Sequence, residues 1–147
     1  RPLFVRSENA NFNIANFMRA QMFTSLGANR KGMDILFDEN VAIDSMLGAG
    51  GYFKTEAGLK YMAASIHTPV SAMETAGEGG PWGMALLAAF MTDGNGASLP
   101  DFLDNNVFGS CKKTTAEPEP ELVESFNIFY NRYIKGLPVE KAAVENL

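Results

Sequence analysis

Residues 41–55 read VAIDSMLGAGGYFKT and join a short alternating segment to a cluster of three glycines. The alternation from Val41 to Leu47 predicts a β-strand, and Gly48, Gly50 and Gly51 predict a tight turn after it. Ligands of open α/β sheets gather beyond the carboxyl ends of strands, where missing side chains let the backbone approach a phosphate or a ribose. This turn is therefore a candidate binding site.

The glycine cluster also has a purely structural interpretation. It departs from the dinucleotide-binding spacing G-x-G-x-x-G, because Phe53 stands at the third glycine position. The chain also contains no G-K-S or G-K-T phosphate loop. A structural turn and a nucleotide-binding turn are both open at this point.

Apolar spacing predicts helices and a second strand on both sides of the turn. A helix is expected over residues 12–36, either continuous or broken near Gly27 and Gly32. The segments after the turn are a helix over 55–66, a strand over 70–73, a buried helix over 81–90, a short helix over 100–105 and a final helix over 122–137. The order strand, turn, helix, strand, helix predicts an α/β fold with a parallel crossover.

A linker is expected near the end of the chain. Residues 114–121 read TTAEPEPE, an acidic segment stiffened by two prolines. We therefore expect residues 1–113 to form one subdomain and residues 122–147 to form a helical tail.

Composition narrows the class of protein. The 147 residues include 12 basic and 17 acidic side chains without a clustered basic face, which argues against nucleic acid as a partner. The single cysteine, Cys111, forms no intrachain disulfide, and we expect a reducing, cytoplasmic setting. No apolar run approaches the roughly 20 residues that a membrane helix requires, so we expect no membrane partner.

Two residues outside the turn could carry chemistry. His67 lacks partners at metal-ligand or triad spacing, so we interpret it as a histidine at a helix end. Glu78 is flanked by glycines, but a lone carboxylate is more often a solvated or helix N-terminal charge. We assign no catalytic residue and no metal ligand in this chain.

Three segments together resemble the C-terminal domain of the FGGY-family carbohydrate kinases. They are VAIDSMLGAGGYFKT over residues 41–55, YMAASIHTPV over 61–70 and GMALLAAFM over 83–91. The resemblance covers about residues 11–91 and implies a partial actin-like (ribonuclease H-like) ATPase domain with helices packed on a small sheet. It also implies ATP and Mg²⁺ as cofactors. The variant EGGPWG over 78–83 is similar to ribulokinase- and xylulokinase-like members, which implies a ketopentose substrate such as xylulose or ribulose.

The resemblance also implies positions for the nucleotide. Gly50 and Gly51 would lie against the ribose and the α-phosphate, and Tyr52 would lie beside the nucleotide. Thr55 would lie near adenine, where relatives often carry asparagine or serine. A threonine offers one hydroxyl in place of an amide that both donates and accepts, so Thr55 is a departure from the family.

The family's N-terminal phosphate loop, sugar-binding residues and catalytic aspartate are not found in this sequence. Phosphoryl transfer requires the sugar hydroxyl, the metal and the γ-phosphate to be held together. We therefore expect a fragment that binds ATP or ADP, meets its sugar through the missing N-terminal domain and is inactive alone. Its sheet edges should be covered by a second chain or by self-association into a homo-oligomer.

Two other functions stay open. The chain could be a non-catalytic actin-like module that works through interaction or oligomerisation. It could also be a different α/β enzyme that uses Glu78, although little in the sequence favours this.

Overall fold

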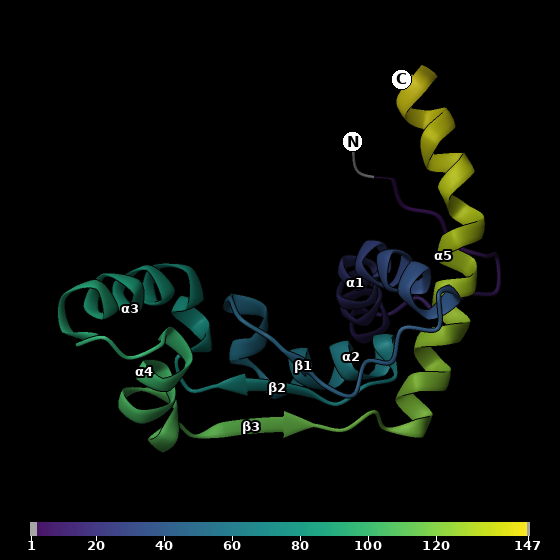
Figure 1. The fold of residues 1–147 in the computed structure, drawn as a ribbon. Coiled ribbons are helices and arrows are strands. Elements are labelled where there is room, and N and C mark those ends of the chain that lie inside the picture. The colour runs from purple at the N-terminus through teal and green to yellow at the C-terminus, as the bar shows by residue number, and fades with distance from the viewer. Residues whose placement is uncertain (1–2, 147) are drawn as a thin grey trace. The chain divides into compact units, whose positions relative to one another are not determined.

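The computed structural model describes residues 3–146 and shows an α/β fold (Figure 1). Its main elements in chain order are α1 (Ile14–Asp38), β1 (Met46–Leu47), α2 (Glu56–Ile66), β2 (Val70–Met73), α3 (Gly79–Asp93), α4 (Leu99–Asn106), β3 (Lys113–Ala116) and α5 (Pro120–Asn146). Short 3-10 helices lie at η1 (Gly51–Lys54), η2 (Ala76–Glu78) and η3 (Phe108–Ser110). The α/β class predicted from the sequence is confirmed.

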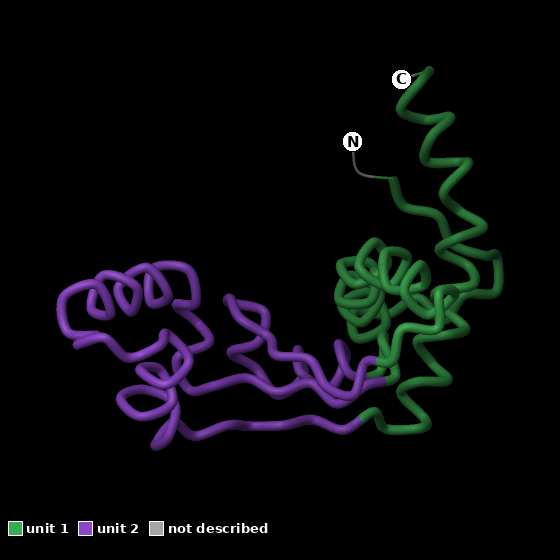
Figure 2. The backbone as a smooth tube through the Cα atoms, viewed as in Figure 1, with its two compact units in different colours: residues 1–42, 64–67, 118–147 green, residues 43–63, 68–117 purple. Residues whose placement is uncertain are grey.

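The chain forms two compact units, which Figure 2 draws in separate colours. Unit 1 consists of residues 1–42, 64–67 and 118–147. Unit 2 consists of residues 43–63 and 68–117 and contains the strands.

Unit 1 is built on the packing of α1 against α5. The Phe23 and Phe126 rings meet edge to face with centroids 5.2 Å apart, and both side chains are almost fully buried. Gly27 makes room for Tyr133, since a Cβ at Gly27 would lie 2.7 Å from that ring. This packing holds α1 as one continuous helix, so the alternative of a break near Gly27 is wrong. Helix α5 also continues beyond the predicted end at residue 137.

A group of polar residues in unit 1 joins three chain segments; we call it the helix joint. Arg30 donates from Nε to Asp34 Oδ1 at 2.7 Å and from Nη1 to the Ser65 carbonyl oxygen at 2.6 Å. Tyr130 of α5 donates its hydroxyl to Asp34 Oδ2 at 2.6 Å. His67 adopts a left-handed φ of 56° just after α2, and its Nε2 lies 3.2 Å from Arg30 Nη1. The prediction of a helix-end histidine is confirmed.

Unit 2 is organised around a three-stranded sheet with the order β1-β2-β3 within the described residues. The predicted parallel crossover is confirmed, because Met46 is in register with Val70 on the parallel strands β1 and β2. Strand β1 is shorter than predicted and contains only Met46 and Leu47. Strand β3 pairs with β2 in the antiparallel direction, and the Ser71 and Thr115 hydroxyls lie 2.7 Å apart.

Two predictions on this unit are wrong. The linker expected over residues 114–121 contains most of β3, since the β-branched Thr114 and Thr115 pair with the buried strand β2. Helix α3 forms where expected but contains no buried residue, and Met84 and Met91 are 68% and 86% exposed. Apolar composition predicted the helix correctly, but it did not determine whether another element covers it.

Candidate functional site

Two loops follow β1 and β2 and meet at one edge of the sheet. Because these strands are parallel, their carboxyl ends lie at the same edge. The first loop, residues 48–55, contains η1, and the second, residues 74–78, contains η2 and leads into α3. The Gly50 N–H donates to the Ala76 carbonyl oxygen at 2.6 Å, so the loops are directly bonded.

Four glycines in the first loop and at the start of α3 fall into two groups. At Gly48 and Gly79 a Cβ would collide with Phe53 and with Ala49, so these glycines allow close packing within the loops. At Gly50 and Gly51 a Cβ would meet no described atom within 4 Å. Gly50 has a φ of 108°, which other residues rarely adopt. The loops are thus tightly packed on one side and bare at Gly50 and Gly51.

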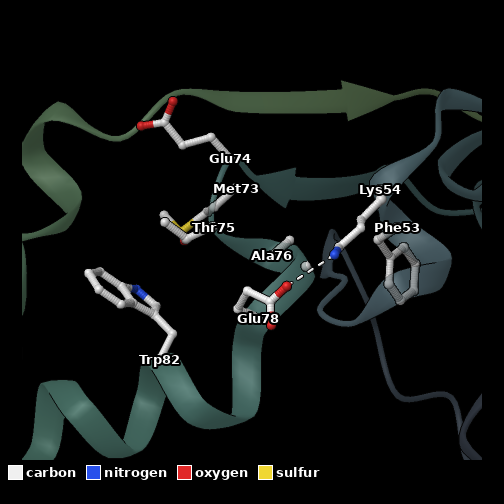
Figure 3. A pocket seen from close by; sticks show the side chains of 9 residues that line it. Phe53, Lys54, Met73, Glu74, Thr75, Ala76, Glu78 and Trp82 are labelled. Carbon is white, nitrogen blue, oxygen red and sulfur yellow. Dashed lines mark hydrogen bonds and ion pairs between the residues drawn. The ribbon is translucent and has the colours of Figure 1, made fainter.

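An open pocket of about 400 Å³ lies between the two loops and the start of α3 (Figure 3). Aromatic rings, one lysine and two carboxylates contribute to its walls. The lining residues are Phe53, Lys54, Met73, Glu74, Thr75, Ala76, Gly77, Glu78 and Trp82. This mixture of apolar surface and a few polar groups is typical of a small-molecule site.

Lys54 and Glu78 form an ion pair across the two loops. Lys54 Nζ lies 3.1 Å from Glu78 Oε1, and Figure 3 shows the two side chains reaching toward each other. Their side chains are 55% and 74% exposed. Ion pairs this exposed stabilise a fold by at most about 1 kcal/mol. Glu78 is the N-cap residue of α3, so the interpretation as a solvated charge at a helix start is confirmed.

The four residues predicted to bind the nucleotide lie next to the pocket but not in its lining. Gly50 and Gly51 form the bare start of η1. The ring of Tyr52 packs edge to face on Phe53 with centroids 5.5 Å apart. The Thr55 hydroxyl accepts from the Gly58 N–H at 3.1 Å, so Thr55 caps the first turn of α2.

Lys54 and Trp82 line the pocket but were not predicted as site residues from the sequence. In a 3-10 helix, positions three apart lie on the same side, so Gly51 and Lys54 share one side of η1. The signal that could have indicated Lys54 as a site residue is its position three residues after Gly51, the last glycine of the turn.

Two features are absent from residues 3–146. No helix there is both long enough and apolar enough to cross a membrane. The same residues contain no group of three or more histidine, cysteine, aspartate or glutamate side chains that could hold a metal ion.

Comparison with known proteins identifies a family. Residues 1–92 match the family model described as the FGGY family of carbohydrate kinases, C-terminal domain. This match covers more than half of the chain and includes both loops of the pocket. No curated protein and no solved structure matches the chain.

Proposed function

The chain belongs to the FGGY family of carbohydrate kinases, and we propose that it forms part of the nucleotide-binding site of the phosphotransferase. The reaction that we propose transfers the γ-phosphate of ATP to a ketopentose, xylulose or ribulose. The ketopentose is supported by the similarity of residues 78–83 to ribulokinase- and xylulokinase-like members.

The observation that carries the proposal is the bare backbone at Gly51. A Cβ at this position would meet open space, and the φ of Gly51 is outside the left-handed region. The fold itself therefore does not require glycine here. A ligand that approaches the backbone at the carboxyl edge of the sheet does explain a glycine, because a side chain would occupy its place.

Each predicted site residue then has a role that its geometry allows. Gly50 supplies the left-handed turn and a bare Cα, while its N–H is already bonded to Ala76. Gly51 allows the ribose and the α-phosphate to reach the loop. Tyr52 packs on Phe53 and so holds the Phe53 ring, which lines the pocket. Thr55 holds the start of α2 near adenine, and its hydroxyl oxygen has a second lone pair for the adenine amine.

Bound ATP supplies the phosphoryl group that is transferred, and Mg²⁺ accompanies its phosphates. The residues of this chain bind and orient the nucleotide. Transfer also requires a positioned sugar hydroxyl and a base, and we assign neither to this chain. We therefore expect the chain alone to bind ATP without phosphorylating xylulose or ribulose, which an assay of sugar phosphate formation tests directly.

The decisive experiment is a titration of the chain with ATP after the substitution Gly51→Val. The valine should fit the fold but block the nucleotide, so we expect an unchanged circular dichroism spectrum and at least about tenfold weaker binding. Gly32→Val is the matched control, because a Cβ at Gly32 also meets nothing within 4 Å but lies on α1 in unit 1. Equal ATP affinity of both variants and the unchanged chain would contradict the proposal.

Self-association is a second proposal, which the exposed helix α3 supports. Between Gly79 and Thr92 this helix carries no charged residue, and Leu87 and Met91 are 45% and 86% exposed. Exposed apolar surface of this kind is typical of protein contacts. We expect light scattering to give the mass of a homo-oligomer, and Leu87→Lys with Met91→Lys to shift that mass toward the monomer. A monomeric mass at micromolar concentration would contradict this proposal.

A further inference from the structure

The pocket contains one basic side chain, Lys54, and this side chain is held by a partner that water can reach. Lys54 ends η1 and Glu78 ends η2, and both line the pocket, so their ion pair joins the two loops in its wall (Figure 3). The Glu78 side chain is 74% exposed, so water already solvates most of it. An anion with more charge than one carboxylate can therefore take the place of Glu78 at little cost.

The stem of Lys54 lies directly against the second loop. A Cβ at Gly77 would collide with Lys54 Cε, so the glycine at this position lets the lysine lie directly across the loop. Lys54 also shares one side of η1 with Gly51, because the two are three residues apart in a 3-10 helix. The Lys54 side chain and the bare backbone of Gly51 thus start from the same side of η1.

We infer that Lys54 contacts the phosphates of the bound nucleotide, and that Glu78 holds this lysine when no nucleotide is bound. The inference rests on the proposed function and names an exchange within the same site. On binding, the Lys54–Glu78 pair separates, a charge-assisted hydrogen bond forms between Lys54 and a phosphate oxygen, and the Glu78 carboxylate returns to water. Glu78 therefore competes with the ligand for Lys54.

The exchange predicts opposite effects for the two residues. Lys54→Gln removes the phosphate contact and should weaken ATP binding about tenfold. Glu78→Gln removes the competitor and should strengthen ATP binding about two- to fivefold. If Glu78 acts only through Lys54, Glu78→Gln should have no effect in the Lys54→Gln background. General repulsion between Glu78 and an anion would instead strengthen binding in both backgrounds.

Trp82 provides the measurement, because it is the single tryptophan of the chain and lines the pocket. Its fluorescence can be followed while the four proteins of this double-mutant cycle are titrated with ATP and separately with adenosine. Adenosine carries no phosphate, so Lys54→Gln should leave its affinity unchanged. The control is Lys60→Gln, which breaks the Lys60–Glu56 pair of the same 3.1 Å length on α2.

The outcomes separate the inference from the proposed function. If the unchanged chain binds ATP and both single substitutions leave its affinity at the control value, the inference is wrong and the proposed function stands. An additive cycle, in which Glu78→Gln has the same effect in both backgrounds, also overturns the exchange. If the unchanged chain binds no ATP by fluorescence or calorimetry, both ideas fail.

Discussion

The two units of the chain contain ion pairs of similar chemistry in very different surroundings. In the helix joint of unit 1, the Arg30 and Asp34 side chains are 14% and 26% exposed and lie 2.7 Å apart. In the pocket of unit 2, the Lys54 and Glu78 side chains are 55% and 74% exposed and lie 3.1 Å apart. Removing one partner should therefore destabilise the fold strongly in the first region, where the pair is mostly buried, and only slightly in the second.

The more buried pair also has more interaction partners. Arg30 bonds to Asp34 and Ser65, and its guanidinium also lies 5.4 Å from the Tyr130 ring centroid. Asp34 accepts from both Arg30 and Tyr130, so each member is held by several elements. The Lys54–Glu78 pair joins two loops by one contact. A group with several buried partners stabilises the fold, whereas a group with one exposed partner is available for exchange.

The largest expected effect comes from adding a side chain to a glycine in each region. Gly27→Val in unit 1 places a Cβ only 2.7 Å from the Tyr133 ring and should lower the free energy of unfolding by about 3 kcal/mol. Gly51→Val should change it by less than about 0.5 kcal/mol, because the space there is open. Urea unfolding followed by circular dichroism measures both. Equal destabilisation by the two valines would contradict the comparison.

A smaller loss of stability is expected from breaking the helix joint. Asp34→Ala leaves both Arg30 and Tyr130 without their shared carboxylate and should reduce the free energy of unfolding by about 2 kcal/mol. The Tyr130→Phe substitution in the Asp34→Ala background should then cost almost nothing more, because the hydroxyl has already lost its acceptor. Independent, additive losses would show that the two residues do not act together.

The helix joint should also make stability depend on pH. Burial alone raises the pKa of Asp34, but the hydrogen bonds from Tyr130 and Arg30 and the charge of Arg30 outweigh it, so the pKa lies below its usual 3.8. Because the folded pKa is the lower one, this stability is present above about pH 4 and is lost as the pH falls through the folded pKa. Burial and the Asp34 hydrogen bond raise the pKa of Tyr130. Its contribution is therefore present below about pH 10 and is lost at higher pH.

The substitution Tyr130→Phe tests this pH dependence at both ends. It should cost about 1 kcal/mol at neutral pH, where the hydroxyl bond to Asp34 is lost. Stability should also fall less steeply at low pH, because Asp34 loses one of its hydrogen-bond donors. At high pH, the loss of stability that comes from ionisation of Tyr130 should disappear. The midpoints of urea unfolding between about pH 2.5 and 11 measure how stability depends on pH at both ends of the range. Unchanged slopes would show that the Tyr130–Asp34 bond is absent in solution.

Sequence patterns predicted the parts of the fold that depend on local signals. Helix α2 and strand β2 have the expected positions, since their apolar spacing and the stop at His67 to Pro69 are visible in the chain. Strand β3 was missed because only one of its four residues is buried and its pairing with β2 is not encoded locally. A polar strand next to prolines gives the same signal as a linker.

The candidate site was predicted to a similar extent. The glycine turn was found because glycines mark a bend, and the two loops do meet, through the hydrogen bond between Gly50 and Ala76. The role of Lys54 could not be predicted, since its position depends on a 3-10 turn and on the space left at Gly77. Spatial pairing of residues 24 apart, as in Lys54 and Glu78, is visible only in the folded chain.

The smallest expected effect on stability is that of the pocket ion pair, and it gives the comparison its sharpest test. Glu78→Ala should change the free energy of unfolding by less than about 0.5 kcal/mol, because both partners are solvated with or without the pair. Glu56→Ala on α2 is the matched control, since it removes a pair of the same length with Lys60. A loss of about 2 kcal/mol for Glu78→Ala, as expected for Asp34→Ala, would mean that the pocket pair holds the two loops together. A lysine held that firmly would not be free to exchange its partner for a ligand.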